Sequence, residues 1–402
     1  MISKIIKLEW VKFVESRKNR LIFILLFLFF LSIIFYNQIE YKNHFEIQER
    51  SMIEQRNKAR GSLKIIQLLI ENDKVYKENP NEILFFENEE TNSLLLEYYY
   101  KDFKVEDSIN ILKTQNKKFE NLIFGQENGF IKTDLLKARG QAPINLMKHI
   151  SQNNYIIDNE IEPIINPYDL NGVNFLLILL KGYTPLILVI FTVLLSMDIF
   201  SSEMEEGSYK LYYTQPFSRK TIYWAKILSG LLFSLGVLIA LISSFFVVIS
   251  ITHGIGKHYY PEAIASSKIL LSFTNNINNL GKFDIVPRSK LIILGYLLMF
   301  ILCLSSIILS VFISIVFKST TKTLGTFTSI ILVNFVMDMF LKETSLFRLY
   351  FPFSYTNIEM VIYGKINSSY LLGITMSIFI IVLLSIAGER IIANSDLLGG
   401  EI

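Results

Sequence analysis

Cysteine is almost absent from this chain, since Cys303 is the only one among 402 residues. A disulfide within the chain is therefore excluded, and any part that faces water must be held together by packing. Charged residues are also scarce, at 19% against about 25% in ordinary soluble domains. The net charge of +3 is small and dispersed, which argues against nucleic-acid binding.

Motifs for catalysis and metal binding are missing as well. The chain has no Gly-x-x-x-x-Gly-Lys-Ser/Thr loop for phosphate, and residues 281–283 lack the first glycine and the hydroxyl. No serine lies in a Gly-x-Ser-x-Gly elbow. His253 and His258 are five residues apart with no cysteine nearby, which is not a metal-ligand spacing. We therefore expect no enzyme activity, no ATP hydrolysis and no metal or other cofactor in this chain.

Long apolar runs are abundant: 51% of the residues are hydrophobic, and 32 are phenylalanine. A membrane-crossing helix needs about 20 apolar residues, and each such segment must be helical because unpaired backbone groups are too costly in lipid. We expect an all-α integral membrane protein with six transmembrane helices. The predicted spans are residues 21–36, 175–200, 227–251, 291–317, 324–341 and 370–387.

The charge of the N-terminal segment predicts the topology. Residues 1–20 carry six Lys or Arg against two Glu, and positive flanks stay in the cytoplasm. Six crossings then return the C-terminal tail, residues 388–402, to the same side. The richness in Lys, Asn and Ile is typical of a low-GC Gram-positive bacterium, so we expect a multi-pass protein of a bacterial cell membrane.

This topology places three segments outside the cell. Residues 37–174 are long enough for a domain, and their apolar residues recur at roughly helical spacing, which predicts a mostly helical extracellular domain. A disordered spacer is the alternative. Residues 252–290 form a shorter loop. Residues 342–369 gather aromatic side chains around Pro352, which is typical either of a re-entrant hairpin or of an ordinary aromatic belt.

The first 20 residues also predict an amphipathic helix ahead of the first span. Five apolar residues share one face of a helical wheel, and most of the lysines lie opposite. Such a helix would lie along the cytoplasmic leaflet, with its lysines near anionic lipid. The apolar face consists of Ile2, Ile6, Trp10, Phe13 and Val14.

The cytoplasmic loop, residues 201–226, predicts a short, firmly ended helix. Ser202 and Glu205 have the spacing of a capping box. Pro216 would end the helix, and Ser218 would cap the next one. A stiff helix between two spans would pass a push from a cytoplasmic partner into the bilayer.

Several residues of this loop resemble the loop of type-2 ABC transporter permeases, the export-type membrane subunits that pair with a separate ATPase. They are Glu203, Gly207, Ser208, Pro216, Ser218, Arg219 and Lys226. The six predicted spans agree, and the N-terminal helix is similar to the elbow helix of that family. Many members have only a short loop between the first two spans, so residues 37–174 are a departure that leaves the substrate class open.

The resemblance implies a coupling helix that docks on the ATPase, a second permease beside this one, and ATP and Mg on the partner rather than on this chain. The candidate coupling residues are Glu203, Glu206, Gly207, Ser208, Pro216, Ser218 and Arg219. The alternative is a merely capped connector whose charges are solvated.

Two charged residues within predicted spans form a second candidate site. Lys181 and Asp338 both lie toward the outer ends of their spans, and ionisable residues in membranes are often functional. We hypothesise that they meet at the outer mouth of a translocation path. Snorkelling of each to the headgroups is the alternative.

These observations together favour the permease subunit of an ATP-driven exporter that moves an amphiphilic cargo, either a peptide or a lipid-like molecule. A membrane sensor or immunity protein that binds an extracellular peptide is a second hypothesis. An ion-coupled carrier is a third, although it predicts inverted repeats and acids that face a cavity.

Overall fold

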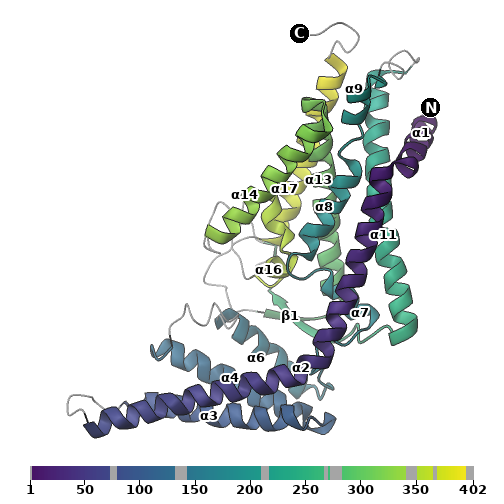
Figure 1. The fold of residues 1–402 in the computed structure, drawn as a ribbon. Coiled ribbons are helices and arrows are strands. Elements are labelled where there is room, and N and C mark those ends of the chain that lie inside the picture. Colours follow the sequence, from purple (N-terminus) through teal and green to yellow (C-terminus); the bar gives the residue numbers. More distant parts are fainter. Residues whose placement is uncertain are drawn as a thin grey trace.

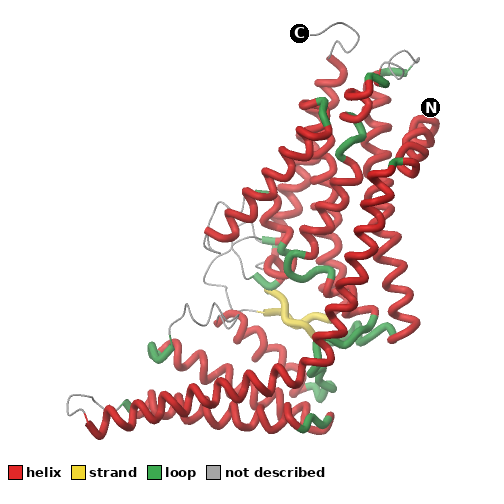
Figure 2. The backbone as a smooth tube through the Cα atoms, viewed as in Figure 1, coloured by secondary structure: helices red, strands yellow, loops and turns green. Residues whose placement is uncertain are grey.

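The fold is described from a computed structural model, shown in Figure 1. The structure describes residues 2–72, 79–131, 143–209, 217–266, 270–271, 283–340, 351–364 and 369–394. The chain forms a bundle of long helices with a helical arm at one end (Figures 1 and 2). The N-terminus and the end of the last described helix lie together at the other end of the bundle.

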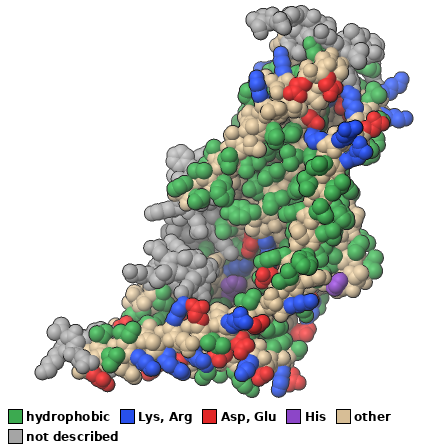
Figure 3. All heavy atoms as spheres, in the orientation of Figure 1, with side chains coloured by type: hydrophobic (Ala, Val, Ile, Leu, Met, Phe, Trp, Pro, Cys, Tyr) green, Lys and Arg blue, Asp and Glu red, His purple; other side chains and the backbone are tan. Residues whose placement is uncertain are grey.

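Five helices within the described residues are long and apolar enough to cross a membrane. They are Arg17–Glu71, Thr184–Glu206, Arg219–His253, Arg288–Phe317 and Tyr370–Asn394. The expected span at residues 324–341 lies on α14 (Thr320–Phe340), which is helical but is not among these five. Figure 3 shows mostly hydrophobic side chains along the bundle and charged ones gathered at its two ends, the distribution expected of a membrane protein.

Helix α13 (Arg288–Phe317) forms the centre of the bundle. It packs against α17 (Tyr370–Asn394), α8 (Thr184–Ser196), α14 and α11 (Arg219–His253). Its residues Leu298, Met299 and Cys303 are fully buried. The sole cysteine is therefore a packing residue of the core.

Helix α1 (Ile2–Glu15) lies against α11 at the end of the bundle that holds the N-terminus. Its protein-facing side is formed by Ile5 and Glu9, which are buried, whereas Trp10 and Val14 are about half exposed. Ile5 packs on α11 beside Ala225. Some residues of the predicted apolar face are therefore exposed. The face of α1 that packs against the protein differs from the predicted one and includes Ile5 and Glu9.

Helix α2 (Arg17–Asn72) is much longer than the expected span at residues 21–36. It passes from the bundle into the arm and bends on the way (Figure 1). No glycine or proline occurs between residues 37 and 60, so nothing breaks the helix. Ion pairs one turn apart, Glu46–Arg50 and Glu54–Lys58, support its polar half.

The arm, as we call it, consists of the second half of α2 with α3 (Pro80–Lys101), α4 (Ser108–Glu127) and α6 (Pro143–Asp158). A single 3₁₀ turn, η1 (Val105–Asp107), joins α3 to α4. Met52, Leu96, Tyr100 and Ile111 form one of its apolar clusters, and burial raises the pKa of Tyr100 to about 12. The described part of residues 37–174 is thus mainly helical and packed.

The second expected span, residues 175–200, is not one helix. It consists of α7 (Gly172–Ile178) and α8, with a break that contains Gly182 at φ +55°. Helix α8 begins at Thr184 with Pro185 in its first turn, where the missing N–H costs no helical hydrogen bond. After α8 the chain turns before α9 (Ser201–Glu206).

A small β-hairpin was not predicted from the sequence. Strands β1 (Pro261–Ala265) and β2 (Phe283–Pro287) pair antiparallel, with Ala263 opposite Ile285. It lies between the bundle and the arm (Figure 2). The 3₁₀ helix η3 (Pro352–Thr356) and α16 (Ile358–Ile362) pack nearby against α13. In η3 the side chains of Phe353 and Tyr355 are buried in the core.

Candidate functional site

The short helix α9 follows α8 at the end of the bundle that holds the N-terminus (Figure 1). It ends at Gly207, which has φ +72° and closes the helix in the left-handed conformation that favours glycine. Its start is not the predicted capping box, because Phe200 occupies the N-cap without a side-chain bond. Instead, Ser202 Oγ donates to the Asp198 carbonyl oxygen at 2.6 Å.

Two acids and two lysines from three helices meet beside α9; we call them the charge cluster. Glu203 accepts from Lys226 Nζ at 2.5 Å and from Lys12 Nζ at 2.6 Å. Glu9 lies 3.4 Å from Lys226 and 3.9 Å from Lys12. Through this cluster α9 is joined to both α1 and α11.

The burial of the charge cluster makes it costly to disturb. The side chains of Lys226 and Glu203 are only 2% and 8% exposed. Lys226 Nζ also donates to the Ile199 carbonyl oxygen at 3.1 Å. Removal of one partner from a buried pair typically destabilises a protein by about 3–5 kcal/mol, because the other charge is left without compensation. The cluster therefore fixes the position of α9 relative to its neighbours.

Helix α9 makes further polar contacts with α13 and α14. The Ser201 backbone N–H donates to Ser314 Oγ of α13 at 2.9 Å. The Glu205 carboxylate accepts from both the backbone N–H and the hydroxyl of Thr320, at 2.9 and 2.5 Å. Glu205 thus serves as a cap for the first turn of α14. A helix of six residues is consequently tied to four others.

The next helix, α11, starts as the sequence predicts. Ser218 is its N-cap, and its side chain accepts from the Thr221 N–H. The first turn is bound to α17, since Lys220 Nζ lies 2.8 Å from Glu389 and Arg219 Nη1 lies 3.5 Å from the Ala393 carbonyl oxygen. Helix α11 therefore begins at Arg219, eight residues before the predicted membrane span at residue 227.

The candidate coupling residues fall into two groups by exposure. Glu206 and Ser218 are exposed, and Gly207, Ser208 and Arg219 are half-buried, whereas Glu203 is buried. Pro216 lies outside the described residues. A cavity of about 940 Å³ between α1, α9 and α11 is lined by Glu203, Glu206 and Ser208 among others. The accessible candidate residues therefore lie at one end of the bundle, close to the buried Glu203.

The second candidate pair is only half described. Lys181 is exposed in the break between α7 and α8 and lines a cavity at the arm end of the bundle. Asp338 lies on α14, but its side chain is outside the described residues. Their meeting stays a prediction.

Sequence reasoning missed Lys12, Glu9 and Glu205 as members of this site. The charged flanks of the apolar runs carried a signal, because charges that border a span have to find water or a partner. Lys18 and Asp198 follow the same logic and lie 2.6 Å apart. The pairing between helices, however, depends on tertiary packing that spacing along the chain does not encode.

The fold and site define an integral membrane protein whose apolar helices are joined at one end by a short, charged helix. The chain belongs to the ABC-2 family of transporter proteins, since the model of that family matches residues 3–393. It is thus the membrane subunit of an ABC transporter, a class that normally works with an ATPase subunit. Comparisons with curated proteins and with solved structures gave no match.

Proposed function

We propose that this chain is the permease subunit of an ATP-driven exporter and that its separate ATPase docks on the end of the bundle around α9. ATP and Mg are then bound by that partner. The N- and C-termini lie on this cytoplasmic side, and the arm lies outside. A second permease, identical or related, completes the pathway, and the cargo is an amphiphilic peptide or lipid-like molecule.

The observation that supports this proposal is the anchoring of α9 within the bundle. A partner that pushes on the exposed Glu206 acts on a helix whose Glu203 is joined to α1 and α11 and whose Glu205 is joined to α14. A displacement of α9 is therefore transmitted to several membrane helices at once. A solvated connector would need no such buried anchor.

The test is the stimulation of ATPase activity in the purified complex. The chain is co-expressed with its genomic-neighbour ABC ATPase, and Glu206→Ala is compared with Glu127→Ala. Each of these residues is exposed and is the last residue of its helix, α9 and α4. We expect at least a fivefold loss of stimulation for Glu206→Ala only. Absence of co-purification, or equal stimulation by both variants, contradicts docking at α9.

A further inference from the structure

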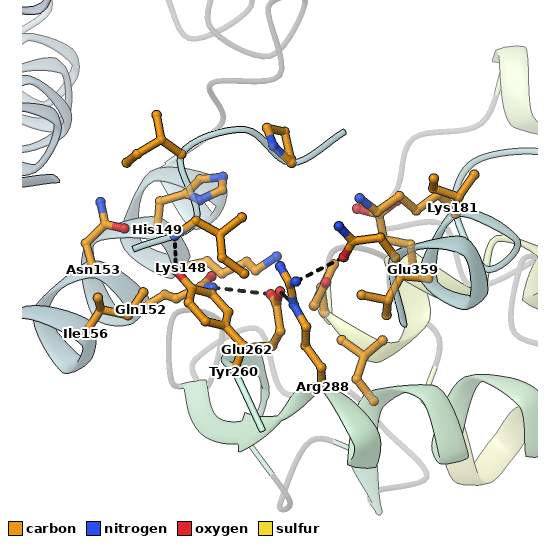
Figure 4. Close-up of a pocket in the computed structure, with 18 of the residues that line it drawn as sticks. Lys148, His149, Gln152, Asn153, Ile156, Lys181, Tyr260, Glu262, Arg288 and Glu359 are labelled. Carbon is orange, nitrogen blue, oxygen red and sulfur yellow. Dashed lines mark hydrogen bonds and ion pairs between the residues drawn. The ribbon is translucent and has the colours of Figure 1, made fainter. Parts of the chain in front are cut away.

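A cavity of about 450 Å³ lies where the arm meets the bundle. Figure 4 shows Lys148 and Gln152 of α6 on one side and Lys181 and Glu359 on the other, with Glu262 of β1 between them. The volume falls within the range of about 300–1,000 Å³ that is typical of small-molecule sites.

One wall of the cavity is apolar and is built from the ends of the bundle helices. Its residues come from α7 and the break after it, from α13 and from α16. Such a wall accepts a hydrocarbon chain, because burial of apolar surface stabilises by about 25 cal/mol per Å². The residues are Leu177, Ile178, Leu180, Leu291, Ile358 and Ile362.

The charged side chains of the cavity do not balance. Arg288 Nε donates to Glu262 at 2.8 Å, and its Nη1 donates to Asn174 Oδ1 at 3.0 Å. That pair is neutral as a unit. The two lysines, Lys148 and Lys181, then face one acid, Glu359, which gives +2 − 1 = +1 for the rest of the lining.

The two lysines have different surroundings. Lys148 is buried, and its Nζ lies 3.2 Å from the centroid of the Tyr363 ring, within cation–π distance. Lys181 is exposed and forms no ion pair with any residue that the structure describes. The cavity thus combines a fixed cation with an accessible one.

We propose that this cavity binds an anionic single-chain lipid, with its phosphate or carboxylate between Lys148 and Lys181 and its chain along the apolar wall. The proposal rests on the proposed export function and narrows its cargo to this class.

A peptide fits the lining less well. The carbonyl oxygens of a peptide require N–H or O–H donors, and three amide side chains of the lining already donate within the protein. Gln152 Nε2 donates to the Pro261 carbonyl oxygen at 2.9 Å, Gln115 Nε2 to Tyr100 Oη at 2.7 Å, and Asn153 Nδ2 to Asn116 Oδ1 at 2.9 Å. What remains for a ligand is positive charge and hydrocarbon contact.

The test uses the full chain with its ATPase in nanodiscs and a dansyl-labelled lysophosphatidylglycerol as the probe. We expect Lys181→Gln and Lys148→Gln each to weaken binding about tenfold, since a charge-assisted hydrogen bond is lost. Lys257→Gln is the control, because Lys257 pairs with Glu162 at 2.5 Å and does not line the cavity. Monoacylglycerol, which lacks the phosphate, and glycerol phosphate, which lacks the chain, are expected to compete poorly.

Three outcomes overturn the lipid site: equal binding by wild type and Lys181→Gln, competition by monoacylglycerol as strong as by the probe, or displacement of the probe by an amphipathic peptide at lower concentration. Lys181 is exposed, so Lys181→Gln is expected to fold. This variant therefore tests the site even if Lys148→Gln unfolds. ATPase stimulation is measured on the same samples. Stimulation without probe binding removes the lipid site alone, whereas probe binding without stimulation removes the exporter proposal alone.

Discussion

A buried ion pair joins two helices of the arm. In the arm, Lys118 of α4 is 3% exposed and lies 3.0 Å from Glu89 of α3. Its ammonium also contacts Ser93 Oγ. Burial lowers the pKa of Lys118, and the carboxylate of Glu89 opposes that shift. The pair therefore stabilises the arm only while both partners are present.

We predict that Glu89→Gln destabilises the arm by about 3 kcal/mol at neutral pH, because it leaves a buried ammonium without a counter-charge. The exposed Glu87 of the same helix provides the control, and Glu87→Gln is expected to change stability by less than about 0.5 kcal/mol. Urea unfolding followed by protease digestion of the arm measures both. Equal stability of the two variants would contradict the pairing.

The same variant has a predictable pH dependence. The pKa of Lys118 in the folded state lies below its value of 10.5 in the unfolded chain, so the unfolded state binds more protons in the interval between the two. The free energy of unfolding then rises with pH across that interval. Loss of Glu89 removes the group that opposes the lowered pKa, so this rise is larger in Glu89→Gln than in the wild type. We expect the deficit of Glu89→Gln to shrink between neutral pH and about pH 10. A deficit that grows with pH would show the opposite sign of shift.

At the scale of elements, α9 is the short helix whose polar contacts connect α1, α11, α13 and α14. We predict that Glu205→Ala removes the cap of α14 and loosens its first turn, because the Thr320 N–H loses its acceptor. Hydrogen exchange at residues 320–323 is then expected to accelerate about fivefold. Glu206→Ala, one residue along, should leave that exchange unchanged. Equal hydrogen-exchange rates in the two variants would show that Glu205 does not cap α14.

The end of α9 depends on backbone geometry. Gly207 has φ +72°, and an added Cβ would meet no atom within 4 Å. We therefore predict that Gly207→Ala costs about 1–2 kcal/mol from left-handed backbone strain alone, and that Gly207→Asn costs less because asparagine tolerates this conformation. Thermal unfolding of the two variants tests the order. A larger loss for asparagine would indicate a clash instead.

The sequence predicts most of this fold from apolar length and helix signals. Ser218 was predicted as a cap and is one, because N-capping is a local interaction. The break at Gly182 and the hairpin at β1 and β2 were not predicted, since an apolar run hides a break and five-residue strands carry a weak signal. The charge cluster joins residues as far apart as Glu9 and Lys226, which no local pattern reveals.

At the scale of the whole molecule, the arm and α9 lie at opposite ends of the bundle (Figure 1). The native Cys303 is fully buried, so introduced cysteines are labelled against a low background. We predict that Glu127→Cys reacts with a membrane-impermeant maleimide in intact cells and that Ser218→Cys reacts only after lysis. The reverse pattern would invert the topology and remove α9 from the cytoplasm.

Helix α2 is continuous from the bundle into the arm, so the two regions have one helix in common. Its arm portion, roughly 29 residues past residue 43, is about 43 Å long at 1.5 Å per residue. If that portion tilts by about 5°, its tip sweeps through roughly 4 Å. A small tilt of the first span within the bilayer would therefore displace the tip of the arm outside the membrane. The position of the arm would then report the orientation of the membrane helices.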